Sequence, residues 1–174
     1  KIYSQEYKDS KPLEALKVTG DTELKGTKIS FKPSKKYFTL TKYNSETLRR
    51  RFKELAFLNS GITIRFTDEA KSVKDEFKYD GGILEYIKEL TRKKTLIQNE
   101  IIYFKSDTKN ISVEMAMLWS TAYNEEVLCF TNNIPQKDGG THLSGFKASL
   151  TKTINSVFDK QPGVKKDKID LTGE

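Results

Sequence analysis

The part of the sequence closest to a phosphate-binding loop runs from Gly140 to Lys147. Its glycines, Gly140 and Gly145, have the spacing of a Walker A motif and precede a segment of helical periodicity, where backbone N–H groups favour anions. Phe146, however, stands where that motif has its phosphate-binding lysine. We therefore expect a loop that starts a helix, and not a mononucleotide site.

Two other residue types capable of chemistry occur once each, as His142 and Cys129. His142 is close in sequence to Asp138 and Ser144, but the members of a catalytic triad normally converge from separate elements. We expect an exposed or capping histidine. Cys129 lies among apolar residues and is expected to be a small core residue. A single cysteine excludes an internal disulfide and a multi-cysteine metal site. The sequence thus predicts neither catalytic residues nor metal ligands.

A run of three arginines, Arg49 to Arg51, could bind phosphate. Consecutive residues on a helix diverge by about 100°, so these side chains form no single patch, and a solvated face is the favoured interpretation. The whole chain has 31 basic and 24 acidic residues, which gives a net charge of +7. This excess is compatible with a polyanionic partner, and a solvated lysine-rich surface explains it equally well.

Composition places the chain among globular proteins. Its 174 residues suffice for one ordinary domain or two small ones. Hydrophobic residues make up 36% and aromatic residues 11%, which excludes disorder for most of the chain. We detect neither a run of about 20 apolar residues, as a membrane span needs, nor an apolar signal core at the start, so a cytoplasmic location is expected. Because the chain opens on Lys1 and enters a strand-like run at once, we expect a fragment of a longer protein.

Hydrophobic periodicity predicts an α+β chain. A helix is expected over 45–58, with an N-cap at Asn44-Ser45, a buried stripe of Leu48, Phe52 and Leu55, and a stop at Asn59-Ser60-Gly61. The other expected elements are strands at 1–7 and 27–31, a hairpin over 62–79, a helix from 83 to 90, strands at 100–105, 111–121 and 125–131, a loop over 132–140, and a helix over 141–158. Gly81-Gly82 is the candidate domain boundary. The lysine-rich tail from Gln161 is expected to be mobile.

Three longer strings carry a more specific signal. They are Phe52-Lys-Glu-Leu-Ala-Phe-Leu-Asn-Ser-Gly-Ile62, Tyr79-Asp-Gly-Gly-Ile83 and Phe130-Thr-Asn-Asn-Ile-Pro-Gln-Lys-Asp-Gly-Gly-Thr-His-Leu-Ser-Gly-Phe-Lys147. The chain resembles the B subunits of bacterial DNA gyrase and their close relatives, the E subunits of topoisomerase IV, and the first of these is favoured. The resemblance extends from Lys1 to Glu174 without a detectable gap.

This resemblance implies a fold and a set of site residues. Residues 1–82 would be the C-terminal part of a GHKL-type ATPase domain, and 83–174 the N-terminal part of a βαβ-type transducer domain. Most family residues that bind ATP and Mg²⁺ would precede Lys1, and the lysine that touches the γ-phosphate would follow Glu174. Gly26 and Thr27 match a motif whose threonine helps to hold the adenine. Lys147 matches a position that is typically an arginine facing the cavity through which DNA passes.

The implied function is that of an ATP-dependent type II topoisomerase. Its partners would be duplex DNA, the A subunit of gyrase and a second B subunit that dimerises on ATP binding. This chain would couple the nucleotide site to the transducer and would have no ATPase activity alone. The alternative is a non-catalytic basic nucleic-acid-binding module, which would hold duplex DNA by itself with a steep salt dependence.

Overall fold

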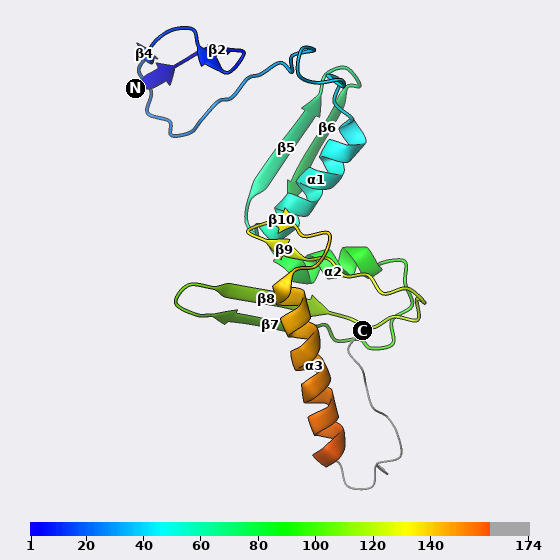
Figure 1. Cartoon of the computed structure of the whole chain (residues 1–174). Coiled ribbons are helices and arrows are strands. Elements are labelled where there is room, and N and C mark those ends of the chain that lie inside the picture. The colour runs from blue at the N-terminus through cyan, green and yellow to red at the C-terminus, as the bar shows by residue number, and fades with distance from the viewer. Residues whose placement is uncertain (161–174) are drawn as a thin grey trace. The chain divides into compact units, whose positions relative to one another are not determined.

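The computed structural model describes residues 1–160, and the tail expected to be mobile lies outside the described residues. The chain divides into two compact units, one formed by Lys1–Leu48 and the other beginning at Arg49. Figure 1 shows the elements in chain order. Within residues 1–160, every helix is too short or too polar to cross a membrane.

The first unit contains four short strands. They are β1 (Ile2–Ser4), β2 (Tyr7–Lys8), β3 (Lys11–Pro12) and β4 (Lys17–Gly20). β1 pairs with β4 and β2 with β3, both antiparallel. The turn between β2 and β3 consists of Asp9 and Ser10, whose φ angles of 50° and 65° suit a tight hairpin. The expected strand over 1–7 is therefore two shorter strands.

The expected strand over 27–31 is wrong, because these residues have no regular secondary structure. The side chains that were to face a core, Ile29 and Phe31, are 80% and 75% exposed. Alternating residues form a stable strand only where a neighbouring strand takes their backbone hydrogen bonds and a core receives their apolar side chains. In this unit the strands pair only with one another, β1 with β4 and β2 with β3.

Helix α1 (Ser45–Leu58) confirms the predicted helix and both of its ends. The Asn44 side-chain oxygen accepts a hydrogen bond from the Thr47 N–H at 3.0 Å, which is an N-cap contact. After the last turn, Gly61 adopts a φ of +84°, a conformation that favours glycine. The helix is therefore specified by local residues at both ends.

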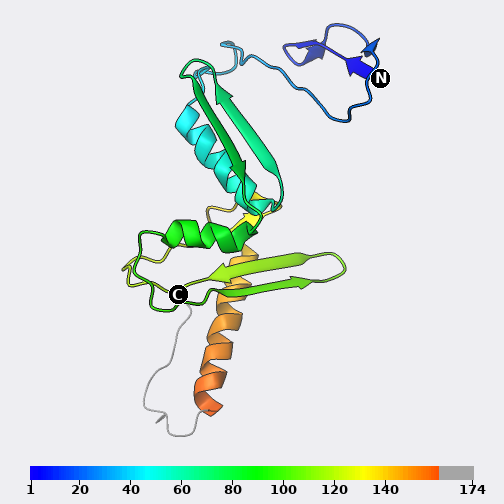
Figure 2. The same ribbon diagram turned by 180° about the vertical axis from the view of Figure 1, so that it is seen from behind.

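The second unit contains the predicted hairpin, β5 (Thr63–Asp68) and β6 (Val73–Lys78), paired antiparallel in register. Its alternation is confirmed, since Ile64 and Phe66 are half-buried between exposed neighbours. The Phe52 and Phe66 rings lie 5.6 Å apart, and Figures 1 and 2 both show α1 lying along the hairpin. Helix and hairpin thus share an apolar layer.

The buried core lies in the second unit. The buried hydrophobic residues among those described are Ala56, Phe57 and Phe77. The predicted stripe of Leu48, Phe52 and Leu55 is only half-buried. Periodicity identified the face of α1 that contacts the hairpin through Phe52. The largest buried side chain of α1, however, is that of Phe57, which also contacts Tyr86 of a second helix.

Helix α2 (Gly82–Thr91) begins at the second residue of the predicted glycine pair and packs on strand β8. β7 (Ile102–Asp107) and β8 (Ser112–Met117) form an antiparallel hairpin. The strand expected over 111–121 is shorter than predicted, although Ser120 still makes an isolated bridge to Leu96. The helix and hairpin predicted for this part of the chain are otherwise confirmed.

The strand expected over 125–131 is largely wrong. Only β9 (Phe130–Thr131) forms, and it pairs with β10 (Ile134–Pro135) inside the expected loop. Asn132 and Asn133 make the turn with φ angles of 49° and 64°, which asparagine tolerates better than most residues. The charged side chains at the start of the predicted strand, Glu125 and Glu126, make ion pairs with other segments instead.

Helix α3 (Thr141–Lys160) confirms the last predicted helix. It begins directly after Gly139 and Gly140, whose φ angles are +81° and +82°. Within the described part of the chain none of its side chains is fully buried, so its apolar stripe is only partly covered. Half-buried positions recur along the helix from Leu143 to Ser156.

Candidate functional site

The two residues expected to contact adenine lie in the first unit. Gly26 and Thr27 are exposed and belong to an irregular segment. A side chain built at Gly26 would meet no described atom within 4 Å. The described residues around this pair therefore do not form a nucleotide pocket by themselves.

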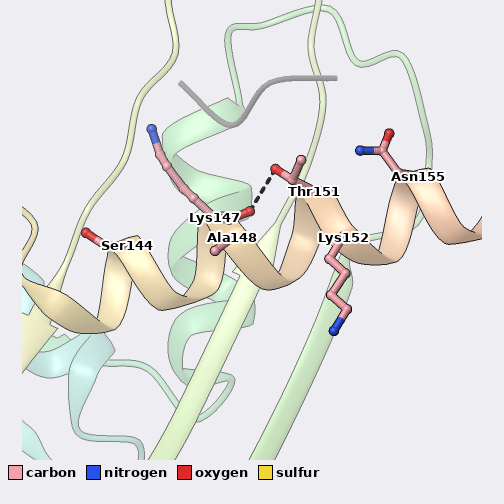
Figure 3. A pocket seen from close by; sticks show the side chains of 6 residues that line it. All are labelled: Ser144, Lys147, Ala148, Thr151, Lys152 and Asn155. Carbon is pink, nitrogen blue, oxygen red and sulfur yellow. Dashed lines mark hydrogen bonds between the residues drawn. The ribbon is translucent and has the colours of Figure 1, made fainter. Parts of the chain in front are cut away.

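Lys147, the residue expected to face DNA, lies on α3 in the second unit. Its ammonium is 3.4 Å from the Glu125 carboxylate, and its side chain is 33% exposed. It lines a shallow surface pocket along one side of α3 (Figure 3) with Ser144, Ala148, Thr151, Lys152 and Asn155. Figure 3 shows Lys147 and Lys152 leaving the helix on different sides. Both lysines remain accessible to a polyanion, although Lys147 already has an acidic partner.

The start of α3 behaves as predicted, although β10 lies within the expected loop. The Ser144 N–H donates to the Gly140 carbonyl at 3.3 Å, a contact that belongs to the first turn of a helix. His142 is exposed, as expected. Cys129 is a half-buried free thiol, so the expected core position is wrong, because the neighbouring Val127 and Leu128 are themselves exposed. The first turn thus begins its own hydrogen-bond ladder at Gly140, as expected of a loop that starts a helix.

The three arginines have different surroundings, which confirms that they diverge. Arg49 donates two hydrogen bonds to Asp75, at 2.7 and 3.0 Å. Arg51 pairs with Glu54 and also donates to the Asn133 carbonyl at 2.8 Å. Arg50 is exposed. The prediction of a solvated face is therefore wrong for Arg49 and Arg51, because the structure brings acceptors to them from distant segments.

An aromatic stack joins α1 to α2. Phe57 is 2% exposed, and its ring lies 3.6 Å from the Tyr79 ring and 4.8 Å from the Tyr86 ring, nearly parallel to both. Burial, followed by the charges of Glu54 and Glu126, raises the pKa of Tyr86 to about 12. Tyr86 therefore stays a neutral phenol at physiological pH.

An ion pair lies beside the stack. The Lys53 ammonium is 2.6 Å from the Glu89 carboxylate and 6.0 Å from the centre of the Phe57 ring. The hydrogen bond from Lys53, and then its charge, hold the pKa of Glu89 below its usual range. The charged pair and the stack fasten the same two helices.

A second polar connection joins α1 to the β9–β10 turn. The Arg51 guanidinium donates to the Asn133 carbonyl at 2.8 Å, and the Asn133 amide donates to the Asn59 side-chain oxygen at 2.8 Å. We call these three residues the Asn133 clasp. Figures 1 and 2 show β9 and β10 beside the C-terminal end of α1. Sequence reasoning missed this clasp, although the Asn132-Asn133 dipeptide is a signal for a left-handed turn.

Two ion pairs hold the segment that precedes β9. Lys94, just after α2, is 2.6 Å from Glu126, and Glu125 pairs with Lys147 on α3. In the second unit the Lys53–Glu89 pair thus connects α1 to α2. The segment at Glu125 and Glu126 connects the end of α2 to α3 through its two ion pairs. No single predicted site residue lies at the centre of this arrangement.

The fold of the whole chain matches part of a known ATPase domain. The ATPase domain of Thermus thermophilus gyrase B, solved with an aminocoumarin, superposes with a TM-score of 0.76 at 28% identity, over 95% of this chain and 46% of that one. This likeness defines the class as an α+β fold of the gyrase B ATPase type. The family model described as DNA gyrase B matches residues 82–174. The chain belongs to the DNA gyrase B family, as the quoted strings predicted.

Curated relatives match over almost all of this chain. The B subunit of DNA gyrase from Staphylococcus epidermidis is 42% identical over 176 residues, which cover 99% of this chain. The corresponding subunit of Caulobacter vibrioides is 37% identical over 187 residues and covers 100% of it. The chain spans only 27% and 23% of the length of these two relatives.

Proposed function

We propose that this chain is the stretch of a B subunit that links nucleotide binding to DNA passage in an ATP-dependent type II topoisomerase. The observation that carries the proposal is the family match over residues 82–174, together with relatives that align along the whole chain. The activity belongs to the intact enzyme, and this stretch contributes structure and coupling to it.

The proposed domains are 1–82, from the ATPase domain, and 83–174, from the transducer domain. The start of the family match at residue 82 supports this division, as does the glycine pair at that place. Gly82 adopts a φ of +59°, so the chain turns sharply there. The aromatic stack, the Lys53–Glu89 pair and the Asn133 clasp all cross this boundary. Such contacts suit a segment that transmits a change between domains.

ATP and Mg²⁺ are the proposed cofactors of the intact protein. Gly26 and Thr27 would contribute to the adenine contact, and the remaining contacts would come from other parts of the protein. Among residues 1–160, no group of three or more histidine, cysteine or acidic side chains is placed to hold a metal ion. The described residues alone therefore form neither a complete ATP site nor a Mg²⁺ site.

Lys147 is the proposed contact to duplex DNA. A lysine attracts backbone phosphate as a point charge, without the bidentate geometry of an arginine. Since Lys147 pairs with Glu125, a phosphate must compete with that carboxylate. The net charge of +7 favours the approach of DNA to the chain as a whole. The other proposed partners are the A subunit of gyrase and a second B subunit, in the bacterial cytoplasm.

The test is reconstitution of the intact B subunit that contains this chain with the A subunit of the same enzyme. We expect ATP-dependent negative supercoiling of relaxed plasmid, and no supercoiling when ATP is omitted. Preferential decatenation without supercoiling would instead assign the enzyme to the topoisomerase IV type. Absence of any ATP-dependent change in topology would overturn the proposal.

The isolated 174-residue chain provides the complementary measurement. We expect no ATP hydrolysis above background and weak binding to duplex DNA. Tight binding that weakens steeply with salt would favour the nucleic-acid-binding module instead. Measurable ATPase activity that Thr27→Ala abolishes would show that the isolated chain carries a nucleotide site of its own.

A further inference from the structure

We propose that the Asn133 clasp is a coupling device, in which Arg51 of α1 and Asn59, the residue after α1, hold the β9–β10 turn and thereby set the position of α3. The inference rests on the proposed function. The proposal makes its three residues positioning residues, which act through the placement of α3.

The clasp is built from side chains that are themselves oriented. Arg51 is held on one side by Glu54 on the next turn of the same helix, and its Nη2 reaches the Asn133 carbonyl at 2.8 Å. Asn59 donates its amide to the Leu55 carbonyl at 2.7 Å, so its oxygen faces the Asn133 amide, which lies 2.8 Å away. Asn133 is therefore held at two points, its carbonyl by Arg51 of α1 and its side-chain amide by Asn59, the residue that follows α1.

The β9–β10 turn leads to α3, the helix that carries Lys147, the proposed DNA contact. From β10 the chain passes through Gly139 and Gly140 into α3, where Lys147 lies on the second turn. The connection is itself hydrogen-bonded, since the Gln136 N–H donates to the Cys129 carbonyl at 2.8 Å and the Gly139 N–H donates to the Gln136 carbonyl at 3.1 Å. Fixing Asn133 therefore constrains where α3 begins.

The clasp differs in chemical character from the aromatic stack between α1 and α2. The stack is centred on Phe57, which is 2% exposed and packs on the half-buried rings of Tyr79 and Tyr86, whereas the clasp consists of polar contacts that are only partly buried. Hydrogen bonds of this kind exchange with water at a small net cost, so they can break and reform. We infer that the stack persists through the cycle and that the clasp is released and remade.

The variants separate geometry from charge. Arg51→Gln removes the guanidinium fork, and Arg51→Lys keeps the charge without the fork. Arg50→Gln is the matched control, because it removes the same charge from the neighbouring, exposed position of α1. Asn133→Gly removes the bond to Asn59 and leaves the carbonyl and the left-handed turn intact, since glycine adopts a positive φ freely.

The experiment uses the intact B subunit together with its partner A subunit, and it measures ATP hydrolysed per supercoiling event. We expect both Arg51 variants and Asn133→Gly to keep basal ATPase within about twofold and to lose supercoiling per ATP by about fivefold or more. Arg50→Gln should match the wild type. If Arg51→Lys or Asn133→Gly supercoils as efficiently per ATP as the wild type, the inference is overturned.

Amide hydrogen exchange gives a readout that does not depend on activity. We expect Arg51→Gln to raise exchange at residues 130–135 by about tenfold, the effect of losing one hydrogen bond, and to leave α2 unchanged. Unchanged exchange at 130–135 would show that no clasp exists. An inactive wild-type enzyme would overturn the proposed function and the coupling role together, whereas an active wild type with unaffected variants would overturn this inference alone.

Discussion

Two segments with the same alternating pattern have opposite outcomes in this chain. Residues 27–31 alternate polar and apolar side chains but form no strand, and Ile29 and Phe31 are 80% and 75% exposed. In β5 the same alternation forms a paired strand, with Ile64 and Phe66 half-buried. The pattern is equally good in both places.

The difference lies in what the chain supplies next to each segment. β5 is followed at once by its partner β6, and α1 covers one face through the contact of Phe52 with Phe66. Within the described residues of the first unit, 27–31 have no such partner strand. An alternating segment thus forms a strand only where a neighbouring strand pairs with it and another element covers its apolar face. Of these two segments, only β5 in the second unit has such neighbours.

The largest expected effect is that of Phe57→Ala. It removes a side chain that is 2% exposed and stacked between two rings, so we expect the free energy of unfolding to fall by about 3–5 kcal/mol. Denaturant unfolding followed by the fluorescence of Trp119, the only tryptophan, measures the second unit directly. A loss below about 1 kcal/mol would contradict a core centred on Phe57.

Arg49→Ala is expected to have an intermediate effect. It breaks a two-bond contact with Asp75, whose side chain is only 20% exposed, and we expect a loss of about 1–2 kcal/mol after allowing for partial exposure. Arg50→Ala on the same helix should change the same transition by less than about 0.5 kcal/mol. If both variants lose less than about 0.5 kcal/mol, the arginine run is a uniformly solvated face after all.

Glu89→Gln tests the ion pair between α1 and α2 through pH. Because Lys53 lowers the pKa of Glu89 in the folded state, the pair stabilises the fold above the usual glutamate pKa, and this stability is lost as the pH falls through the lowered value. We expect Glu89→Gln to be less stable than the wild type at pH 7 and equal to it in strong acid. Lys53→Gln should abolish the same pH dependence, and a difference that persists in acid would exclude the pair as its cause.

The smallest effect is expected for Phe31→Ala in the first unit. Its ring is 75% exposed and contacts the Tyr43 ring edge-on at 6.1 Å. We expect the unfolding transition reported by Trp119 to move by less than about 0.5 kcal/mol. A loss comparable with that of Phe57→Ala would show that residues 27–31 are packed in solution.

Much of the fold was predictable because it depends on neighbouring residues. The Asn44 cap, the Gly61 stop and the spacing of apolar residues defined α1, and similar signals placed the β5–β6 hairpin, α2 and α3. The strand predictions at 27–31 and 125–131 were wrong because a strand needs a neighbouring strand to pair with. Local sequence does not show whether the fold supplies one. The quoted strings identified the family, which the comparisons confirm.

The candidate site was less predictable than the fold. Gly26, Thr27 and Lys147 came from the resemblance, and their roles remain proposals. The Lys53–Glu89 pair and the Asn133 clasp join residues separated by 36 to 82 positions in the chain. These residues are of types that are common on protein surfaces. Their types therefore do not distinguish them from side chains that are simply solvated.

The sequence by itself determined the α+β class, the helices with their caps, the family and the absence of a Walker lysine, because each depends on residue type and short spacing. Only the tertiary structure decided which arginines have acceptors, which face of α1 is buried, and that Asn133 is held by both Arg51 and Asn59. The physical reason is that a hydrogen bond or a stack between distant segments depends on where both ends lie in space. Spacing along the chain does not contain that information.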